Sequence, residues 1–229
     1  MPFDVSGLEK EIGTKFKDKN LLLQALTHRS YLNENPDWAL DHNERLEFLG
    51  DAVLELVVTE YLYLNFPNPE GEMTNWRAAL VNANMLSEVS VKFNLNQFIL
   101  LSRGEAKDTG RARQYILANA VEALIGAVYL DQGYEVSKKF IHAFILDELN
   151  RIIEKRLYRD AKSLFQEKAQ EKVGITPSYE VLEEWGPDHA RQFRVGVFLE
   201  KENVAEGEGP SKQEAQQSAA EKALAKKRW

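Results

Sequence analysis

The sequence predicts a mainly α-helical protein, in which an all-helical first domain is followed by a small domain with the order α-β-β-β-α. Apolar residues recur at helical spacing through most of residues 6–159. From residue 161 onward, short segments alternate apolar and polar side chains as strands do, and helical patterns flank them. The pattern changes near residues 157–161, so we expect domains of 1–157 and 158–229.

The composition indicates a soluble globular protein. A chain of 229 residues that is 44% hydrophobic can bury a sizeable core. It contains no cysteine, which excludes disulfides, zinc–thiolate sites and cysteine nucleophiles. Its uncharged runs are shorter than the ~20 apolar residues of a membrane helix, and no segment resembles an export signal. We therefore expect a cytoplasmic protein without a membrane partner.

The charge is unevenly distributed. A net charge of −7 argues against a general polyanion binder. Residues 161–229 hold 11 basic and 12 acidic side chains, a charge of −1, which leaves −6 for residues 1–160. The acidic excess therefore lies in the first domain, where bound cations would offset part of it.

The chain begins with helical segments and a polar loop. Apolar spacing predicts helix through residues 6–32, and residues 33–43 form a loop rich in Asn and Asp that contains Pro36. His28 lies near the end of the helical part. A lone histidine is more often a hydrogen-bonded structural residue than a ligand, and we expect that role for His28.

A long helix is predicted from about residue 42 to residue 65, and it carries an acidic stripe. At about 100° per residue, Glu44, Glu47 and Asp51 fall within an arc of roughly 60°. Carboxylates on one stripe repel one another. The stripe is either a solvated acidic face or a docking face for hard divalent cations, which bind clustered carboxylate oxygens. The apolar face is expected to hold Leu46, Leu49, Val53, Leu56 and Val57.

Helix-breaking Pro and Gly residues and the spacing of apolar residues predict the next elements. Two prolines and a glycine in residues 66–71 end the long helix, and a second amphipathic helix is predicted over 72–93. The Arg- and Lys-rich loop at 102–113 is either simply solvated or close to a phosphate backbone. Residues 137–159 are predicted to be helical and end in several basic residues. Expected core residues of the 72–93 helix are Trp76, Leu80, Met85, Leu86 and Val89.

Residues 114–130 form a second informative stretch, in which Glu122 is the only charged residue. A helix this apolar should be buried nearly all round. Burying a carboxylate without compensation costs several kcal/mol, so Glu122 should be paired, protonated or bound to a metal. A salt bridge, for example to Arg45, and a metal site both satisfy this requirement. The many Ala and Gly residues of the stretch would allow another helix to approach closely.

These two stretches resemble the ribonuclease III family, whose members cut double-stranded RNA with magnesium. Residues 44–54, Glu-Arg-Leu-Glu-Phe-Leu-Gly-Asp-Ala-Val-Leu, resemble the family signature, and Asn119 with Glu122 matches its second motif. The resemblance implies Mg²⁺, which Mn²⁺ can replace, held by Glu47, Asp51, Asn119 and Glu122. It assigns catalysis to Asp51 and Glu122. It also implies 5′-phosphate products with short 3′ overhangs and a role in rRNA and mRNA processing.

One position departs from the family pattern. The family normally has Asp where this chain has Asn119, and Asn keeps an oxygen donor but loses the negative charge. Asn119 can still hold a metal-bound water, but we expect weaker metal binding or slower cleavage. Such a residue fits both a natural variation and an engineered block on cleavage.

The resemblance also implies a homodimer whose two sites cut opposite strands. Phe48 is then either the apolar residue that enters the partner subunit or an ordinary core residue. Glu44 is expected either to order Arg45 or to lie at the dimer interface.

The second domain resembles the double-stranded RNA-binding domain. The α-β-β-β-α order is accompanied by local matches at residues 165–167, 186–189 and 211–212. Such domains read the shape and the 2′-hydroxyls of duplex RNA. The resemblance implies that Gln166 and Gln170 face one minor groove, that His189 faces the next and that Lys212 meets phosphate. We expect no DNA binding, because the domain lacks a helix rich in Arg and Asn for reading base edges.

The second domain departs from its family as well. Two adjacent lysines are usual before the last helix, and this chain has Lys212 followed by Gln213. Together with the charge of −1, this predicts modest affinity for RNA and a shallow salt dependence.

Two other functions compete with nuclease activity. A non-cleaving protein that binds double-stranded RNA is supported by Asn119. A structural ribosomal component is disfavoured, because such a protein has no reason to keep clustered, mutually repelling acids at Glu47, Asp51 and Glu122.

Overall fold

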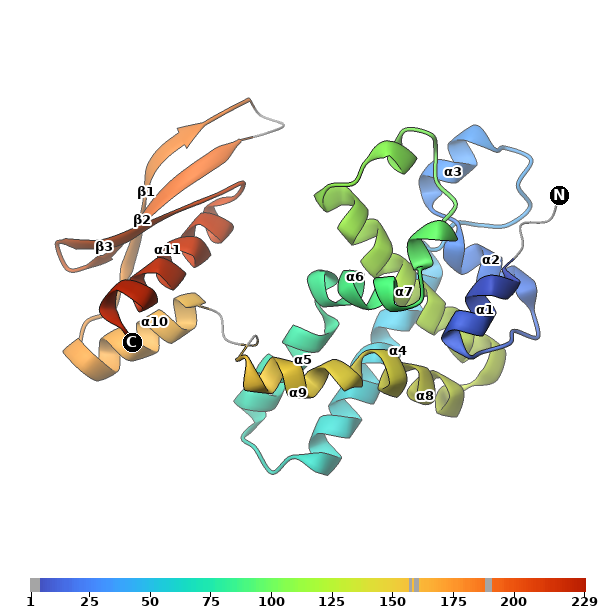
Figure 1. Ribbon diagram of the computed structural model, residues 1–229, viewed down its shortest axis with the longest axis horizontal. Coiled ribbons are helices and arrows are strands. Elements are labelled where there is room, and N and C mark those ends of the chain that lie inside the picture. The colour runs from blue at the N-terminus through green and yellow to red at the C-terminus, as the bar shows by residue number, and fades with distance from the viewer. Residues whose placement is uncertain (1–4, 157, 159–160, 188–190) are drawn as a thin grey trace. The chain divides into compact units, whose positions relative to one another are not determined.

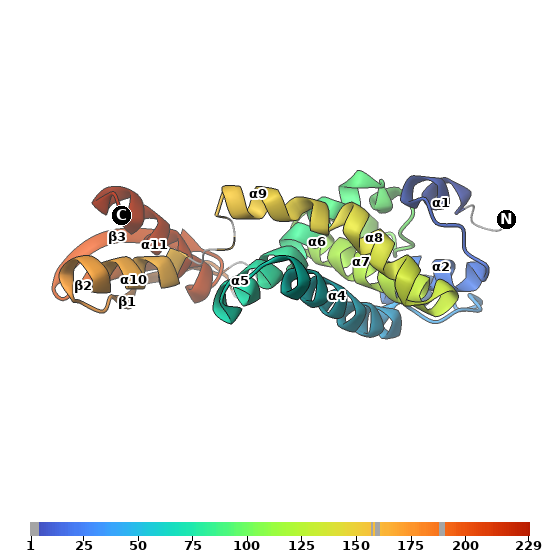
Figure 2. The ribbon, with the colours of Figure 1, turned by 90° about the horizontal axis from the view of Figure 1, so that it is seen from below.

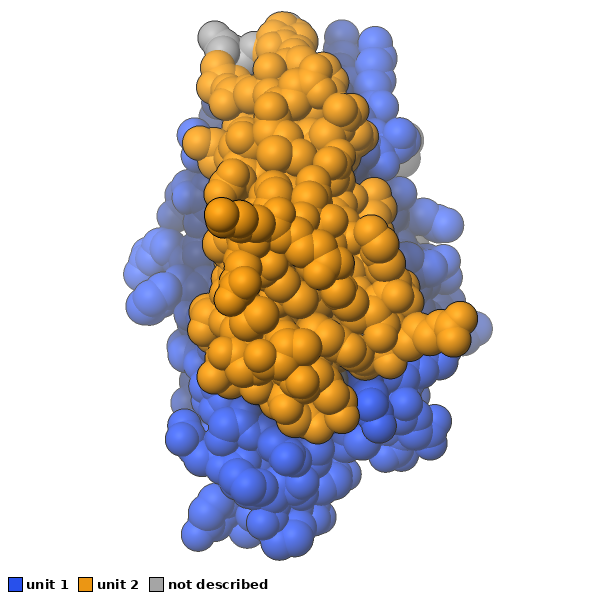
Figure 3. All heavy atoms as spheres, turned by 90° about the vertical axis from the view of Figure 1, so that its left-hand side faces the viewer, with its two compact units in different colours: residues 1–158 blue, residues 159–229 orange. Residues whose placement is uncertain are grey.

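The computed structural model describes residues 5–156, 158, 161–187 and 191–229. The chain forms two compact units, Met1–Tyr158 and Arg159–Trp229, which Figure 3 shows in different colours. The predicted mainly α-helical class is confirmed. The domain limits predicted from the sequence, 1–157 and 158–229, stay a prediction. Residues 157, 159 and 160, which surround this boundary, lie outside the described residues.

Unit 1 is helical throughout its described part (Figure 1). Three short 3₁₀ turns, Leu95–Gln97, Glu105–Lys107 and Leu146–Glu148, join some of its helices. The α-helices are α1 (Ser6–Ile12), α2 (Lys19–Leu26), α3 (Arg29–Glu34), α4 (Glu44–Asn65), α5 (Glu70–Val81), α6 (Ala83–Lys92), α7 (Arg111–Gln132), α8 (Tyr134–Phe144) and α9 (Leu149–Glu154).

The centre of unit 1 is the contact between α4 and α7, which run beside each other in Figure 2. Two glycines bring their backbones together. A Cβ atom on Gly50 would lie 1.7 Å from the carbonyl oxygen of Glu122, and one on Gly126 would lie 2.2 Å from that of Leu46. The expectation that small residues of the 114–130 stretch admit another helix is therefore correct, and that helix is α4.

The segment predicted as one helix over 72–93 is two helices, because Asn82 interrupts it. The ψ angle of Asn82 is 158°, and its side chain accepts a hydrogen bond from the Met85 N–H at 3.0 Å. Its amide group also donates to the carbonyls of Ala78 and Ala79. Asn82 thus caps the end of α5 and the start of α6. All five predicted core residues of this segment are buried.

Two other long helical predictions are interrupted in the same way. Residues 6–32 contain α1, α2 and the start of α3, and α1 ends at Gly13, whose φ of 65° is left-handed. The segment predicted as helix from 137 to 159 holds most of α8, a 3₁₀ turn and α9. His28 has the structural role expected for it, since it caps α3 by accepting a hydrogen bond from the Ser30 N–H at 3.3 Å.

Unit 2 has the predicted order, with α10 (Ala161–Val173), β1 (Ser178–Trp185), β2 (Gln192–Leu199), β3 (Glu202–Gly209) and α11 (Lys212–Lys227). The strands form an antiparallel sheet in the order β1-β2-β3. Helix α11 packs on β2 and β3, and α10 packs against α11 (Figure 1). Phe193, Val195 and Val197 are buried in the core, and Ser211 caps α11 by accepting a hydrogen bond from the Glu214 N–H.

Within the described part of the chain, no helix is both long enough and apolar enough to cross a membrane.

Candidate functional site

The acidic stripe of α4 faces α7 at the point where the two helices touch. Glu47 and Asp51 flank Gly50 in the sequence, and Gly50 lies against the backbone of Glu122. One turn earlier on α7, Asn119 lies on the same side as Glu122. The close backbone contact therefore brings together all four predicted metal-binding residues.

Glu122 is the most strongly perturbed acid of this group. Burial, and after it the neighbouring carboxylates of Asp51 and Glu47, together raise its pKa to about 8. No cation contributes to the shift, and Arg45 is exposed. Within the described residues, the salt bridge considered from the sequence is therefore not formed.

Glu47 is linked to both helices. The pKa of Glu47 is raised mainly by burial and, to a smaller extent, by the negative charges of Glu44 and Asp51. A hydrogen bond from the Asn119 side chain acts in the opposite direction and lowers it. Asn119 therefore keeps contact with the acidic group although it carries no charge, and its amide group orients the Glu47 carboxylate.

The four side chains that meet at the α4–α7 contact are oxygen donors, and the three carboxylates among them repel one another. Among the described residues, no three Asp, Glu or His side chains are arranged so that they could hold a metal ion directly. The available donors are the carboxylates of Glu47, Asp51 and Glu122 and the amide oxygen of Asn119, which are ligand types that Mg²⁺ accepts. The pKa of Glu122 is raised first by burial and then by the neighbouring carboxylates, and a bound cation would favour its ionised form against both effects. The chemistry of these residues thus fits a hard divalent cation.

Glu44 lies at the edge of this group. Its carboxylate pairs with Arg29 at 3.6 Å and lies 3.8 Å from Nδ1 of His42. Glu44 therefore forms its described arginine ion pair with Arg29. The expectation that Glu44 orders Arg45 is not supported by a described contact between the two.

An exposed apolar stripe adjoins the acidic stripe on α4. The exposed fractions are 82% for Phe48, 57% for Leu56 and 76% for Tyr63. Phe48 is therefore not a core residue, and the expectation that Leu56 belongs to the buried face is wrong. With Ala52 and Thr59 these residues recur every three or four positions, so one side of α4 is largely apolar and exposed in the described part of the chain.

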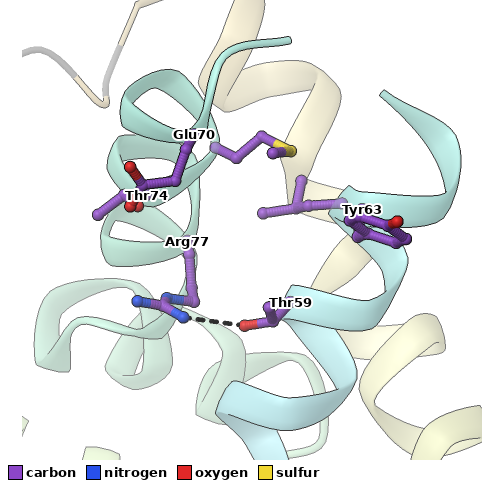
Figure 4. A pocket seen from close by; sticks show the side chains of 7 residues that line it. Thr59, Tyr63, Glu70, Thr74 and Arg77 are labelled. Atoms are coloured by element: carbon purple, nitrogen blue, oxygen red, sulfur yellow. Dashed lines mark hydrogen bonds between the residues drawn. The ribbon is translucent and has the colours of Figure 1, made fainter. Parts of the chain in front are cut away.

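A pocket of about 250 Å³ opens at the far end of this stripe, between α4 and α5 (Figure 4). Arg77 crosses it and donates to Oγ1 of Thr59 at 3.0 Å. The sequence pattern alone does not predict this pocket, although apolar residues that recur along the exposed side of α4 lead to it. Its lining residues are Thr59, Leu62, Tyr63, Glu70, Met73, Thr74 and Arg77.

The predicted RNA-binding residues of unit 2 are exposed where they are described. Gln166 and Gln170, one turn apart on α10, line an open hollow with Thr176. Lys212 starts α11, and its Nζ lies 5.7 Å from the ring centre of Phe193. His189 lies outside the described residues.

Comparisons with known proteins agree with this geometry. A family model described as Ribonuclease-III-like matches residues 18–149, and the model of the double-stranded RNA binding motif matches residues 161–227. The chain belongs to the ribonuclease III family. Ribonuclease 3 of Carboxydothermus hydrogenoformans is 45% identical over 218 residues, which cover 95% of this chain and 93% of that protein. Ribonuclease 3 of Natranaerobius thermophilus is also 45% identical, over 97% of this chain and 96% of its own.

A solved structure supports the assignment of unit 1 to the ribonuclease III family. The nuclease domain of ribonuclease III from Campylobacter jejuni is 43% identical, with a TM-score of 0.57, and the match covers 62% of this chain and 96% of that domain. The description of that structure refers to flexibility in a region involved in dimer formation.

Proposed function

We propose that this ribonuclease III family member is an endoribonuclease that hydrolyses double-stranded RNA with Mg²⁺. The observation that carries the proposal is the meeting of Glu47, Asp51, Asn119 and Glu122 across the α4–α7 contact. Its products carry 5′-phosphates and short 3′ overhangs, and it acts in rRNA and mRNA processing in the cytoplasm. Mn²⁺ is expected to replace Mg²⁺.

The roles of the residues follow from their surroundings. When bound, Mg²⁺ would supply a water molecule of lowered pKa and positive charge for the attacking and leaving oxygens of the phosphodiester. Glu47, Asp51 and Glu122 would supply the carboxylates that hold the ion, and their side chains would have to turn from the described positions, in which no three of them could hold an ion directly. Glu122 has a raised pKa and is largely protonated at neutral pH, so it must release its proton when it becomes a ligand. Asn119 donates a hydrogen bond to Glu47 and so orients its carboxylate, and its amide oxygen would be available to a water held by the ion.

Asn119 supports a second candidate function, a protein that binds double-stranded RNA without cutting it. One negative charge fewer near the ion weakens its binding. The retained acids favour the nuclease, because three carboxylates that repel one another are costly unless a cation uses them.

A homodimer is supported by the apolar stripe of α4. Phe48 and Tyr63 lie eight and seven residues from Leu56, on opposite sides of it along the stripe. If two copies of α4 pair antiparallel about a twofold axis near Leu56, Phe48 of one copy lies near the Tyr63 pocket of the other. The acidic group adjoins the stripe, so Glu44 lies near this interface.

Unit 2 would hold duplex RNA through Gln166, Gln170 and Lys212, with His189 as a further expected contact. Gln side chains suit 2′-hydroxyls, and a lysine at a helix N-terminus suits phosphate.

Cleavage of a long RNA duplex tests the proposal. The parent should cut with Mg²⁺, Glu122→Gln should not cut but should bind the duplex equally well, and Asn119→Asp should cut faster, most clearly at low Mg²⁺. Exposed Glu11, replaced by Gln, is the matched control. Equal cleavage by the Glu122→Gln variant and the parent would refute the metal assignment, and binding without cleavage by both the parent and Asn119→Asp would favour the second candidate.

A further inference from the structure

The charges of unit 2 are separated between its helices and its sheet. Strands β1, β2 and β3 contain six glutamates and one basic residue, Arg194, whereas α10 and α11 contain seven lysines and four glutamates. The net charge of −1 for residues 161–229 therefore hides an acidic sheet beside a more basic helical layer.

The acidic residues concentrate on the face of the sheet that points away from the helices. Along β2, the buried residues Val195 and Val197 face the core, so Arg194, Gly196 and Phe198 face outward. Strand register places Glu180 and Glu206 directly opposite Gly196, on either side. Glu183 and Glu208 lie opposite Arg194 in the same way.

The two halves of this face differ in charge balance. Arg194 pairs with Glu183 at 2.9 Å and with Glu208 at 2.8 Å and stacks over Trp185, so the arginine offsets one of the two negative charges in its half. Around Gly196, Glu206 accepts a hydrogen bond from the neutral amide of Asn203, and its charge acts on Arg194 without a described ion pair. No described ion pair involves Glu180. This half therefore holds two carboxylates and no basic side chain of its own.

An apolar platform lies between these two carboxylates. A Cβ on Gly196 would meet the ring of Phe198 at 2.8 Å and Leu182 at 3.1 Å, so both side chains cover the glycine. Leu182 occupies an irregular position between Val181 and Glu183 and is 43% exposed. Neighbouring strands are about 4.8 Å apart, which separates Glu180 from Glu206 by roughly 10 Å.

We infer that this outward face, defined by Glu180, Leu182, Gly196, Phe198 and Glu206, docks a basic protein segment. Its occupant carries an apolar side chain that covers Leu182 and Phe198, between Lys or Arg residues that reach the two glutamates. Charge complementarity identifies this partner, and the same charge repels RNA. The sheet face therefore leaves the helical residues Gln166, Gln170 and Lys212 available to RNA.

Titration of the full-length protein with a capped peptide, Lys-Leu-Lys-Leu-Lys-Leu, tests the inference. Amide resonances of β1, β2 and β3 around Gly196 should shift, and those around Gln166 should not. The double variant Glu180→Gln/Glu206→Gln should weaken peptide binding by about fivefold or more, because it removes two exposed charge contacts. Leu182→Ser should weaken it as well. Affinity for duplex RNA should not fall in either variant.

The matched control is Glu11→Gln/Glu221→Gln, which removes two exposed glutamates from helices. An equal loss of peptide binding in this control would show general charge attraction and overturn the inference. Absence of binding by the parent, or shifts centred on the helices, would also overturn it. A change in sedimentation caused by Glu180→Gln/Glu206→Gln would show that the face joins two copies of the chain, and this too would contradict the inference.

Discussion

Gly50 on α4 lies against the carbonyl oxygen of Glu122 on α7, so closely that a Cβ atom would stand 1.7 Å from that oxygen. This contact decides where the acidic side chains go. Glu47 and Asp51 flank the glycine, and both carboxylates act on the pKa of Glu122. The helix packing and the candidate metal site are therefore one structural feature.

Replacing Gly50 by Ala should separate the two helices. The added methyl group cannot fit at this distance from a backbone oxygen, so the helices must shift, at a cost of about 1–3 kcal/mol in the free energy of unfolding. Cleavage should fall sharply even in the folded fraction, because the donors move apart. Urea unfolding and a cleavage assay measure the two effects.

Gly71→Ala is the matched control for this substitution. Gly71 lies in the first turn of α5, and nothing lies within 4 Å of its Cβ position. Since Ala favours helix over Gly by up to ~1 kcal/mol, this variant should be as stable as the parent or slightly more stable. A Gly50→Ala protein with parental stability and activity would refute the role given to the contact.

The metal-free protein should lose stability as the pH rises from about 4.5 to about 8. In the folded state the pKa of Glu122 is raised to about 8 from the ordinary 4.5, so the folded state binds more protons than the unfolded state within this window. The stabilisation is fully present at pH values below the pKa of Glu122 in the unfolded chain, and it is lost as the pH rises through the pKa of Glu122 in the folded protein. Because the carboxyl is partly solvated, we expect a loss of about 1–2 kcal/mol.

Glu122→Gln should flatten this pH dependence, since a neutral amide does not titrate. Mg²⁺ should stabilise the parent more at pH 8 than at pH 5, because it binds the ionised acids. Chemical unfolding with a chelator and with Mg²⁺ measures both. An identical pH profile for the parent and Glu122→Gln would show that Glu122 is not the titrating group.

The sequence predicted where helices and strands occur better than it predicted where a long helical segment is broken into two helices. Helical periodicity continues across Asn82, so the pattern over residues 72–93 indicates one helix, although the Asn side chain caps two. The sequence singled out the four candidate metal-binding residues that the structure brings together, because residues 44–54 form a contiguous motif and Glu122 is isolated in an apolar helix. The sequence could not predict that Phe48 and Leu56 are exposed, because an apolar side chain that contacts a partner has the same helical spacing as one that enters the core.

The exposed stripe of α4 should be needed for dimer formation. Phe48→Ser removes the most exposed large apolar residue of the helix and should shift the protein toward monomer in sedimentation, without loss of helix content. Val91→Ser is the control, since Val91 is 68% exposed on α6, outside the stripe. A Phe48→Ser protein that sediments like the parent, or an equal effect of Val91→Ser, would contradict this placement of the interface.

Unit 2 should prefer duplex RNA to duplex DNA and to single strands, with little dependence on sequence. Its described candidate contacts, Gln166 and Gln170, are neutral groups suited to 2′-hydroxyls, and DNA lacks these hydroxyls. Gln166→Ala should weaken RNA binding by about 1 kcal/mol, the usual contribution of one hydrogen bond. Lys212→Ala should weaken it more at low salt than at high salt, because a phosphate contact releases counterions.

The exposed Lys222, farther along α11, supplies the control for Lys212. Lys222→Ala removes the same charge from the same helix, so it should leave the slope of affinity against salt closer to that of the parent. Filter binding with RNA duplex, DNA duplex and single-stranded RNA over a range of salt concentrations measures all of these effects. Equal affinity for the two duplexes would refute recognition through 2′-hydroxyls. Equal losses in the two lysine variants would show that Lys212 acts only through the overall charge of the domain.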